Sequence, residues 1–307
     1  MSIQITARIT DPEILAFIER TAAFYPEGKA NLALAERRRQ YDAMAAALRR
    51  PRPEALRVTD ETVPGPAGPV PVRRYLPPDP GPVTVLYFHG GGFVLGGLDS
   101  HDDVSAEIAA RTSCPVLAVD YRLCPEHIHP AAYDDALAAT RAALAHGPVI
   151  LAGDSAGANL AAAVCLALKD GGIRGQVLIY PTLGGDLLGL ASYEENAEAP
   201  MLTTRDMEYY RRTRAGGPVP HDDPTFFPFA AADFSGLAPC FISSAEADPL
   251  RDDGPEYARR LGAAGVEARC VVEPQLPHGH LRARHTARRA AEAFDRVIAA
   301  IADFAGR

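Results

Sequence analysis

Short apolar runs alternate with longer amphipathic stretches along most of the chain. The apolar runs are rich in β-branched residues and have the length of strands. The stretches between them carry apolar residues at helical spacing. This alternation is typical of a mostly parallel sheet whose strands are joined by covering helices. We therefore predict eight strands, at 57–63, 70–76, 83–89, 116–121, 148–153, 176–180, 240–246 and 267–272.

Further helical patterns lie outside this alternation. Residues 14–25 and 32–50 have helical periodicity and end at a proline-rich segment. Between the strands at 176–180 and 240–246 lie about sixty residues, far more than a connection needs. This insertion contains a helical pattern flanked by Gly- and Pro-rich pieces, at 202–214. We expect residues 1–50 to contribute helices to a cap, and 51–307 to form the main domain with a cap insertion at about 184–220.

Composition sets limits on the class of protein. The chain has 307 residues, of which 47% are hydrophobic, so it can bury a full core. A net charge of −8 and scattered arginines provide no basic surface, and we expect no nucleic-acid partner. The chain has no apolar run long enough to span a membrane, and its first residues lack the pattern of a signal peptide. We expect a cytoplasmic protein.

Cysteines and histidines show no metal-binding spacing. The five cysteines form an odd set without a Cys-x-x-Cys pair, so we expect buried free thiols. The nine histidines include no His-Glu-x-x-His motif. We therefore predict no metal site and no cofactor.

The pentapeptide Gly-Asp-Ser-Ala-Gly lies between an apolar strand and a helical stretch rich in Ala and Leu. In this context it is typical of a strained strand-to-helix turn that exposes a nucleophilic serine, here Ser155. Side chains at Gly153 or Gly157 would collide with neighbouring backbone. The N–H of Ala156, at the helix N-terminus, would stabilise an oxyanion. The alternative is a serine that only caps the helix. Asp154 holds the variable position, and we expect its side chain to point away from Ser155.

A second glycine-rich motif, His-Gly-Gly-Gly-Phe, follows the strand at 83–89. Motifs of this type supply oxyanion donors in lipases and esterases, because consecutive glycines let the backbone approach an acyl carbonyl. We assign Gly91 and Gly92 as donors, and His89 and Gly90 as residues that shape the loop. The alternative is a flexible loop without a role in binding.

Four motifs in this order make the chain resemble the hormone-sensitive-lipase-like family of α/β hydrolases, in particular its esterases with the Gly-Asp-Ser-Ala-Gly motif. The resemblance implies an α/β-hydrolase fold: a mostly parallel eight-stranded sheet flanked by helices, with a helical cap. It also implies an oxyanion hole of Gly91, Gly92 and Ala156. The motifs are HGGGF at 89–93, VDYRLCPEHIHPAAYDDA at 119–136, GDSAGAN at 153–159 and DPLRDDG at 248–254.

A serine nucleophile needs an imidazole to take its proton and a carboxylate to orient the imidazole. In α/β hydrolases the acid follows the serine in the chain and the histidine comes last. Asp248, at the end of the strand at 240–246, is our predicted acid, and the resemblance points to the same residue. Asp252 and Asp253 are alternatives, but their place at a helix start suits capping and solvent exposure.

The loop after the last strand offers two histidines. His278 occupies the position of the family's base, and His280 stands where the family commonly has phenylalanine. We favour His278 as the base; His280 then lines the substrate site or packs beneath the cap. In the 119–136 motif we expect an ion pair between Arg122 and Glu126. Surface or packing positions are expected for His101, His146, His221 and His285.

These residues predict a serine carboxylesterase that acts through an acyl-enzyme, and the resemblance implies esters of short to medium acyl chains. Phe93, Leu183, Phe226 and Phe227 either line the substrate pocket or pack in the core. Two other functions stay open: a hydrolase of amides, carbonates or lactones, and a non-catalytic small-molecule receptor on the same fold. The predicted partner is a small-molecule ester, and the resemblance implies a homodimer formed through the last strand.

Overall fold

The computed structural model describes residues 9–25, 32–169 and 171–307. Its centre is an eight-stranded sheet in the order β1-β2-β4-β3-β5-β6-β7-β8. The first two strands pair antiparallel with their neighbours, and β3 to β8 are parallel. The predicted strands are confirmed, with small shifts at their ends. They are β1 (Arg57–Val63), β2 (Val70–Leu76), β3 (Thr84–Phe88), β4 (Val116–Val119), β5 (Val149–Asp154), β6 (Ile173–Ile179), β7 (Cys240–Ala247) and β8 (Ala268–Pro277).

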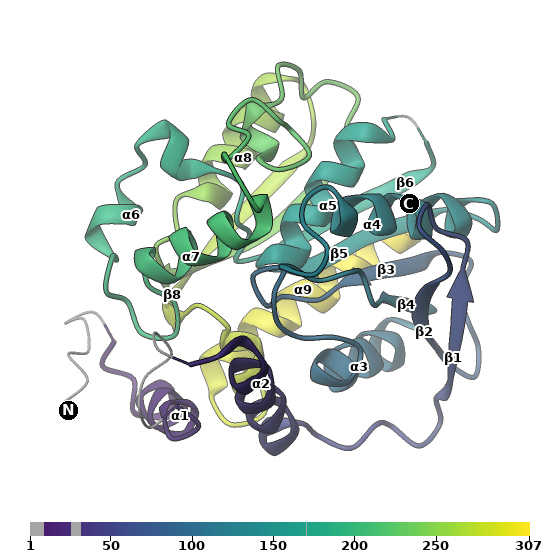
Figure 1. Ribbon diagram of the computed structural model, residues 1–307. Coiled ribbons are helices and arrows are strands. Elements are labelled where there is room, and N and C mark those ends of the chain that lie inside the picture. Colours follow the sequence, from purple (N-terminus) through teal and green to yellow (C-terminus); the bar gives the residue numbers. More distant parts are fainter. Residues whose placement is uncertain (1–8, 26–31, 170) are drawn as a thin grey trace.

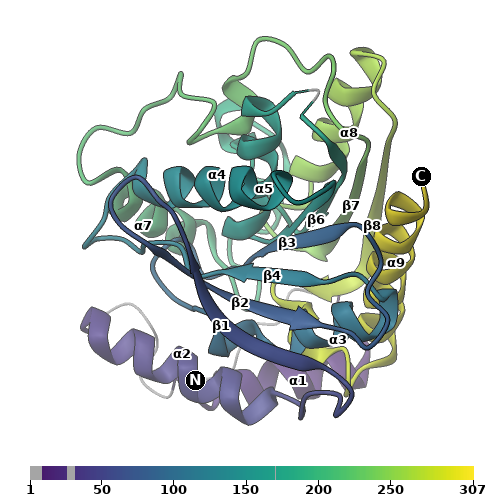
Figure 2. The same cartoon turned by 90° about the vertical axis from the view of Figure 1, so that its right-hand side faces the viewer.

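Helices cover both faces of the twisted sheet (Figure 1, Figure 2). One face packs against α3 (Asp102–Thr112) and α9 (Arg288–Gly306), and its core also includes side chains of α1 (Pro12–Ala22). The other face packs against α4 (Ala131–Leu144), α5 (Ala156–Ala167) and α8 (Asp253–Ala263). Because the central strands are buried on both faces, they appear in the sequence as continuous apolar runs.

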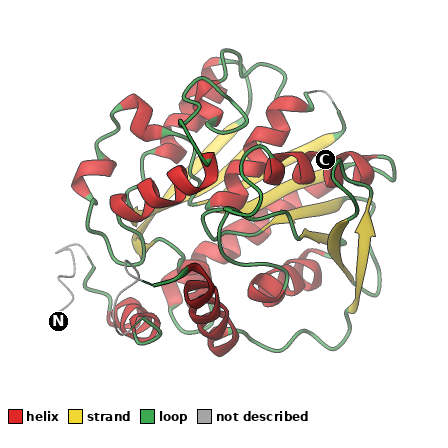
Figure 3. Cartoon of the chain, in the orientation of Figure 1, coloured by secondary structure: helices red, strands yellow, loops and turns green. Residues whose placement is uncertain are grey.

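The insertion between β6 and β7 is mostly short helices and loops (Figure 3). Its longest helix, α7 (Thr204–Ala215), begins with a capping box in which Thr203 and Asp206 bond each other's backbone N–H. Its shorter helices are η2 (Gly185–Leu188), α6 (Ser192–Glu195) and η3 (Pro228–Ala230). The described N-terminal helices are α1 and α2 (Leu34–Leu48), and the predicted domain boundaries stay a prediction.

The last strand is longer than its apolar pattern indicated. We expected it to end at residue 272, before the polar segment Glu-Pro-Gln, but β8 continues beside β7 to Pro277. The side chain of Glu246 supports this extension by accepting a hydrogen bond from the N–H of Gln275. His278 therefore follows directly on the strand end.

All five cysteines are free, as predicted; four are buried and Cys270 is partly buried. Across the described ranges, no helix has the length and apolar character to cross a membrane.

Candidate active site

Ser155 lies on the turn between β5 and α5, with a backbone φ of 52° and ψ of −113°. A positive φ is strained for a residue with a side chain, and such strain is common where a turn must present a reactive group. The tight turn also explains the two flanking glycines. A Cβ atom on Gly153 would lie 2.6 Å from the carbonyl oxygen of Phe88, and one on Gly157 would overlap the same oxygen.

The glycine-rich loop after β3 has a left-handed backbone at two positions. Gly91 and Gly92 have φ angles of 129° and 63°, and a Cβ on Gly91 would overlap the carbonyl of Leu95. Within residues 9–25, 32–169 and 171–307, nothing accepts a hydrogen bond from the N–H of either glycine. Ala156 begins α5, so its N–H has no acceptor within the helix. The predicted oxyanion donors therefore carry free N–H groups.

His89 and Gly90 hold the base of this loop. The His89 ring is buried and stacks on Tyr121 at 4.3 Å between ring centroids. Its Nδ1 lies 2.8 Å from the Gly90 carbonyl oxygen, and the Tyr121 hydroxyl donates to the His89 carbonyl at 2.6 Å. Burial lowers the pKa of His89 to about 3, so its ring is neutral at physiological pH.

Ser155, His278 and Asp248 form one chain of hydrogen bonds. Nε2 of His278 lies 3.0 Å from Oγ of Ser155, and Nδ1 of the same ring lies 2.7 Å from Oδ2 of Asp248. Asp248 is fully buried, and its second oxygen accepts a hydrogen bond from the N–H of Leu250 at 2.9 Å. Since three strand ends meet at one edge of the sheet, His278 lies 30 residues from Asp248 and 123 residues from Ser155 in the sequence but bonds to both.

The two alternative acids lie elsewhere. Asp253 is fully buried, so its expected solvent exposure was wrong. It accepts hydrogen bonds from the N–H of Leu183 and the hydroxyl of Tyr193, and thereby ties α8 to the inserted segment. Asp252 pairs with Arg251. Neither carboxylate bonds to His278 in the described structure.

For His280 and Leu183 we expected either a place beside the substrate or a packing role; both are buried, and neither lines the cavity. His280 packs edge-on against Tyr180, and its Nδ1 lies 3.1 Å from the Pro277 carbonyl oxygen. Burial lowers the pKa of His280 to about 4, and the nearby His278 also contributes. Both rings contact Tyr180, but of the two histidines only His278 bonds to Ser155.

A cavity of about 160 Å³ adjoins Ser155 and His278. Its floor includes the two oxyanion glycines and Phe93, and Phe226 and Phe227 also line it. Side chains from the α1 region, α2 and α7 also line it, and the division into cap and main domain stays a prediction. These lining residues are Thr21, Tyr25, Arg37, Tyr41, Met44, Met207, Tyr210, Arg211 and Arg214.

Asp154 lies buried behind the oxyanion loop. Its Oδ1 accepts hydrogen bonds from the N–H of Gly90 at 2.9 Å and the hydroxyl of Tyr87 at 2.8 Å, and the Tyr180 hydroxyl donates to Oδ2. Nε2 of His101 lies 3.4 Å from Oδ1. Burial alone would raise the pKa of Asp154, but the contact with His101 and the hydrogen bond from Tyr87 hold it below the usual range.

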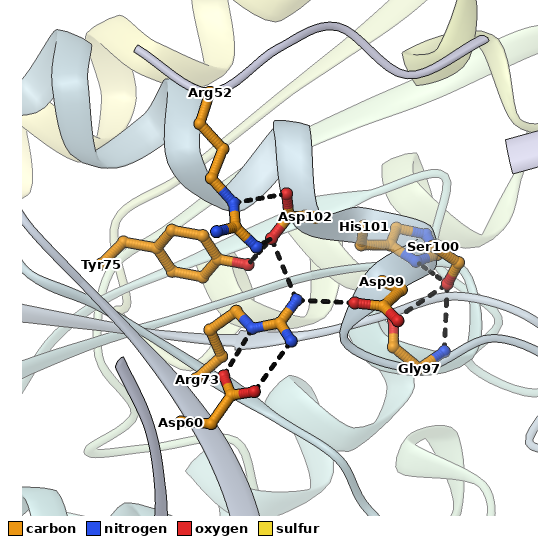
Figure 4. A network of polar contacts seen from close by, with 9 residues as sticks. All are labelled: Arg52, Asp60, Arg73, Tyr75, Gly97, Asp99, Ser100, His101 and Asp102. Carbon is orange, nitrogen blue, oxygen red and sulfur yellow. Dashed lines mark hydrogen bonds and ion pairs between the residues drawn. The ribbon is translucent and has the colours of Figure 1, made fainter. Parts of the chain in front are cut away.

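A wider polar network holds His101 in place (Figure 4). Its Nδ1 lies 2.9 Å from the hydroxyl of Ser100, which also donates to the Gly97 carbonyl. The next residue, Asp102, binds Arg52 with both carboxylate oxygens and contacts Arg73. These contacts tie the start of α3 to strand β2 and to the segment before β1. Sequence reasoning placed His101 on the surface or in packing, because a lone histidine before a helix carries no motif.

The expected ion pair between Arg122 and Glu126 does not form. Arg122 instead binds both oxygens of Asp135 on α4, and Glu126 binds Arg38 on α2. The close spacing in sequence was misleading, because the following helix α4 and the remote helix α2 each bring a better placed partner to one of the two charges.

With this geometry in place, the comparisons with known proteins identify the family. Residues 85–282 match the family described as having the alpha/beta hydrolase fold. The esterase LipI of Mycobacterium tuberculosis is 40% identical over 82% of this chain and 84% of its own. The ethyl acetate hydrolase of Pseudomonas putida is 31% identical over 95% of this chain and 98% of its own.

Solved structures agree with these relatives. The structure of the hyperthermophilic esterase from the archaeon Pyrobaculum calidifontis has a TM-score of 0.88 and 33% identity, and the match covers 96% of this chain and 98% of that one. The structure named bacterial heroin esterase has a TM-score of 0.87 and 30% identity, with 96% and 97% covered. The chain belongs to the α/β hydrolase fold family, and its resemblance to the hormone-sensitive-lipase-like esterases is confirmed.

Proposed function

We propose that this protein is a serine carboxylesterase that hydrolyses esters of short to medium acyl chains through an acyl-enzyme. The observation that carries the proposal is the continuous chain of hydrogen bonds from Asp248 through His278 to Ser155. This is the arrangement that activates a serine nucleophile. Relatives named esterase or carboxylesterase support the same reaction class.

His278 takes the proton of Ser155 through Nε2 as the serine oxygen attacks the ester carbonyl carbon. The imidazolium formed is stabilised by Asp248 at Nδ1. When the tetrahedral intermediate collapses, His278 gives the proton to the leaving alcohol. A water molecule then attacks the acyl-enzyme with His278 again as base, and the acid is released.

The negative charge that develops on the carbonyl oxygen is stabilised by the N–H groups of Gly91, Gly92 and Ala156. Support for these roles is their free N–H groups beside Ser155 and the left-handed backbone of both glycines. One donor of this kind typically contributes a factor of about 10² to 10³ to kcat.

The cavity volume supports small substrates. An apolar cavity of about 150 Å³ holds a molecule the size of benzene. The cavity of about 160 Å³ beside Ser155 thus suits a short acyl or alcohol group. Apolar contacts from Phe93, Phe226 and Phe227 would bind that group. We expect kcat/KM for p-nitrophenyl esters to be highest for short to medium acyl chains and to fall for long ones.

A fluorophosphonate probe followed by peptide mass spectrometry tests the nucleophile. We expect the adduct on Ser155 and no labelling of Ser155→Ala. Undiminished turnover of p-nitrophenyl butyrate by Ser155→Ala would overturn the assignment.

His278 and His280 form a matched pair on one loop, and they test the base. His278→Ala should lose turnover by several orders of magnitude, as expected for a triad histidine. His280→Ala should keep the reaction, because His280 lies outside the cavity and bonds to backbone. The opposite pattern would transfer the role of base to His280.

Two further properties complete the proposal. We propose a homodimer formed through β8, which is at the edge of the sheet and has an exposed apolar residue, Val272. Light scattering after size-exclusion chromatography tests it, and a monomer at micromolar concentration would contradict it. We also propose a cytoplasmic location, which cell fractionation tests.

A further inference from the structure

Arg214 is a buried cation in the cavity that adjoins Ser155. It comes from the last turn of α7, and its side chain is only 3% exposed, yet it lines the cavity. The guanidinium lies between two aromatic rings, 3.7 Å from the centroid of Phe93 and 4.3 Å from that of Phe226. Phe93 follows the oxyanion glycines directly, so the cation is held close to the reacting end of the cavity.

The hydrogen-bond partners of Arg214 are all neutral. One terminal nitrogen donates to the side-chain oxygen of Asn159 at 3.2 Å and to the Phe226 carbonyl at 3.1 Å. The other donates to the Thr225 carbonyl at 3.0 Å. These three bonds leave two of the five guanidinium N–H groups without an acceptor. Within the described part of the chain, Nε has no partner at all.

No carboxylate of the described residues pairs with Arg214. Asp223 attracts it from a distance, but that carboxylate already bonds to His129 and Thr225. A buried charge is normally paired, because its removal from water is unfavourable even after the protein relaxes around it. Burial lowers the pKa of Arg214 to about 9, which still leaves the guanidinium charged at neutral pH.

The rest of the cavity lining does not supply the missing negative charge. Four arginines and two aspartates line the cavity. Asp186 forms an ion pair with Arg211, and Asp154 is bound to Gly90 and Tyr87 behind the oxyanion loop. The lining therefore has an excess of positive charge, with Arg214 as its deeply buried member.

We propose that Arg214 makes this cavity select esters that carry a second, anionic group, and that a carboxylate on the substrate pairs with its guanidinium. A carboxylate suits the site because it can accept two N–H groups of one guanidinium. The inference rests on the proposed ester hydrolysis and names its substrate class: monoesters of short dicarboxylic acids, or short acyl esters of hydroxy acids. The cavity volume limits both to a few carbon atoms.

Steady-state hydrolysis by pH-stat titration tests the preference. The substrates are the monoethyl esters of succinate, glutarate and adipate, with the carboxylate on the acyl side, and O-acetyl lactate, with the carboxylate on the alcohol side. Each is compared with its neutral diethyl or ethyl ester analogue. We expect the wild-type protein to have a higher kcat/KM for at least one anionic ester than for its neutral analogue. A wild-type protein that favours every neutral analogue would overturn the proposal.

Arg214→Met should lower that anionic-to-neutral ratio by about tenfold to a hundredfold, the range for loss of a hydrogen bond to a charged group. Arg214→Lys keeps the charge but not the paired donors, so it should retain part of the preference. Arg205→Met is the matched control: Arg205 is an exposed arginine of the same helix and lies outside the cavity. A purely structural role would lower stability in Arg214→Met and leave the ratio unchanged, and that result would also overturn the proposal.

Calorimetric binding separates this inference from the proposed reaction. In Ser155→Ala protein, adding Arg214→Met should weaken the binding of monoethyl glutarate by about tenfold to a hundredfold. Adding Arg214→Lys should weaken it less. If the wild-type protein hydrolyses no ester but binding of the probe depends on Arg214, the proposed reaction is wrong and the anion site is supported. Hydrolysis of neutral esters with no Arg214-dependent binding would refute the anion site alone.

Discussion

The buried carboxylate of Asp154 should support catalysis without touching the substrate, because it anchors the oxyanion loop at Gly90. Asp154→Ala removes the acceptor of two short hydrogen bonds, from the Gly90 N–H and the Tyr87 hydroxyl. Each buried donor left without a partner costs about 1–3 kcal/mol, so the loss is about 2–6 kcal/mol. A protein of ordinary stability, about 5–15 kcal/mol, would be weakened severely.

Asp154→Asn is therefore the sharper variant. Its amide oxygen can still accept from Gly90, but the negative charge facing His101 is gone and the amide adds donors of its own. We expect kcat to fall by about tenfold to a hundredfold, less than the 10² to 10³ for loss of one whole oxyanion donor. KM should change little, because Asp154 acts on the loop that binds the transition state.

The assay is steady-state hydrolysis of p-nitrophenyl butyrate, together with the rate of fluorophosphonate labelling and urea unfolding. Asp79→Asn is the matched control, since Asp79 is an exposed aspartate in a loop. Full kcat and unchanged stability in Asp154→Asn at pH 7 would refute the reasoning.

The wild-type protein and Asp154→Asn should also differ in how their stability depends on pH. The pKa of Asp154 is lowered in the folded protein, so its charged form adds stability above the unfolded pKa of about 3.9. This contribution is lost as the pH falls from there toward the folded pKa. The difference in unfolding free energy between wild type and Asp154→Asn should be largest above pH 5 and should shrink at pH 3. A difference that grows toward low pH would contradict the assignment of charge.

Three other substitutions follow from the contacts. Gly157→Ala should prevent folding or lower the melting temperature severely, because its Cβ would overlap the Phe88 carbonyl oxygen; a stable, active variant in thermal unfolding would contradict this. His280→Phe should keep kcat and the melting temperature within a few degrees, as the ring is buried and uncharged; a large loss of kcat would assign it a further role. Glu126→Gln should cost less than about 1 kcal/mol in urea unfolding, since its pair with Arg38 is exposed.

Features that depend on a few neighbouring residues could be predicted from the sequence. The alternating runs located all eight strands. The central strands gave the clearest pattern, because strands buried on both faces must be apolar throughout, whereas β1 is mostly exposed. The glycines around Ser155 and in the oxyanion loop were identified because the backbone there excludes a Cβ. Chain order and the position at the end of β7 favoured Asp248 over Asp252 and Asp253. In the structure, the Asp248 carboxylate is hydrogen-bonded to His278.

Pairings between distant segments were decided only by the tertiary structure. Arg122 and Glu126 were expected to pair because they are neighbours in sequence, but packing of α4 and α2 provides other partners for both. His101 carried no motif, and its contact with Asp154 arises because α3 begins behind the oxyanion loop.

Ser155 itself shows where the division lies. A local pattern was sufficient to recognise its turn, since the strain is confined to residues that adjoin it in the chain. The character of the cavity that it faces, with the buried Arg214 between Phe93 and Phe226, depends on how the inserted segment folds back over the sheet. A side chain's burial and partners are set by packing between remote segments, and no short stretch of sequence specifies that packing.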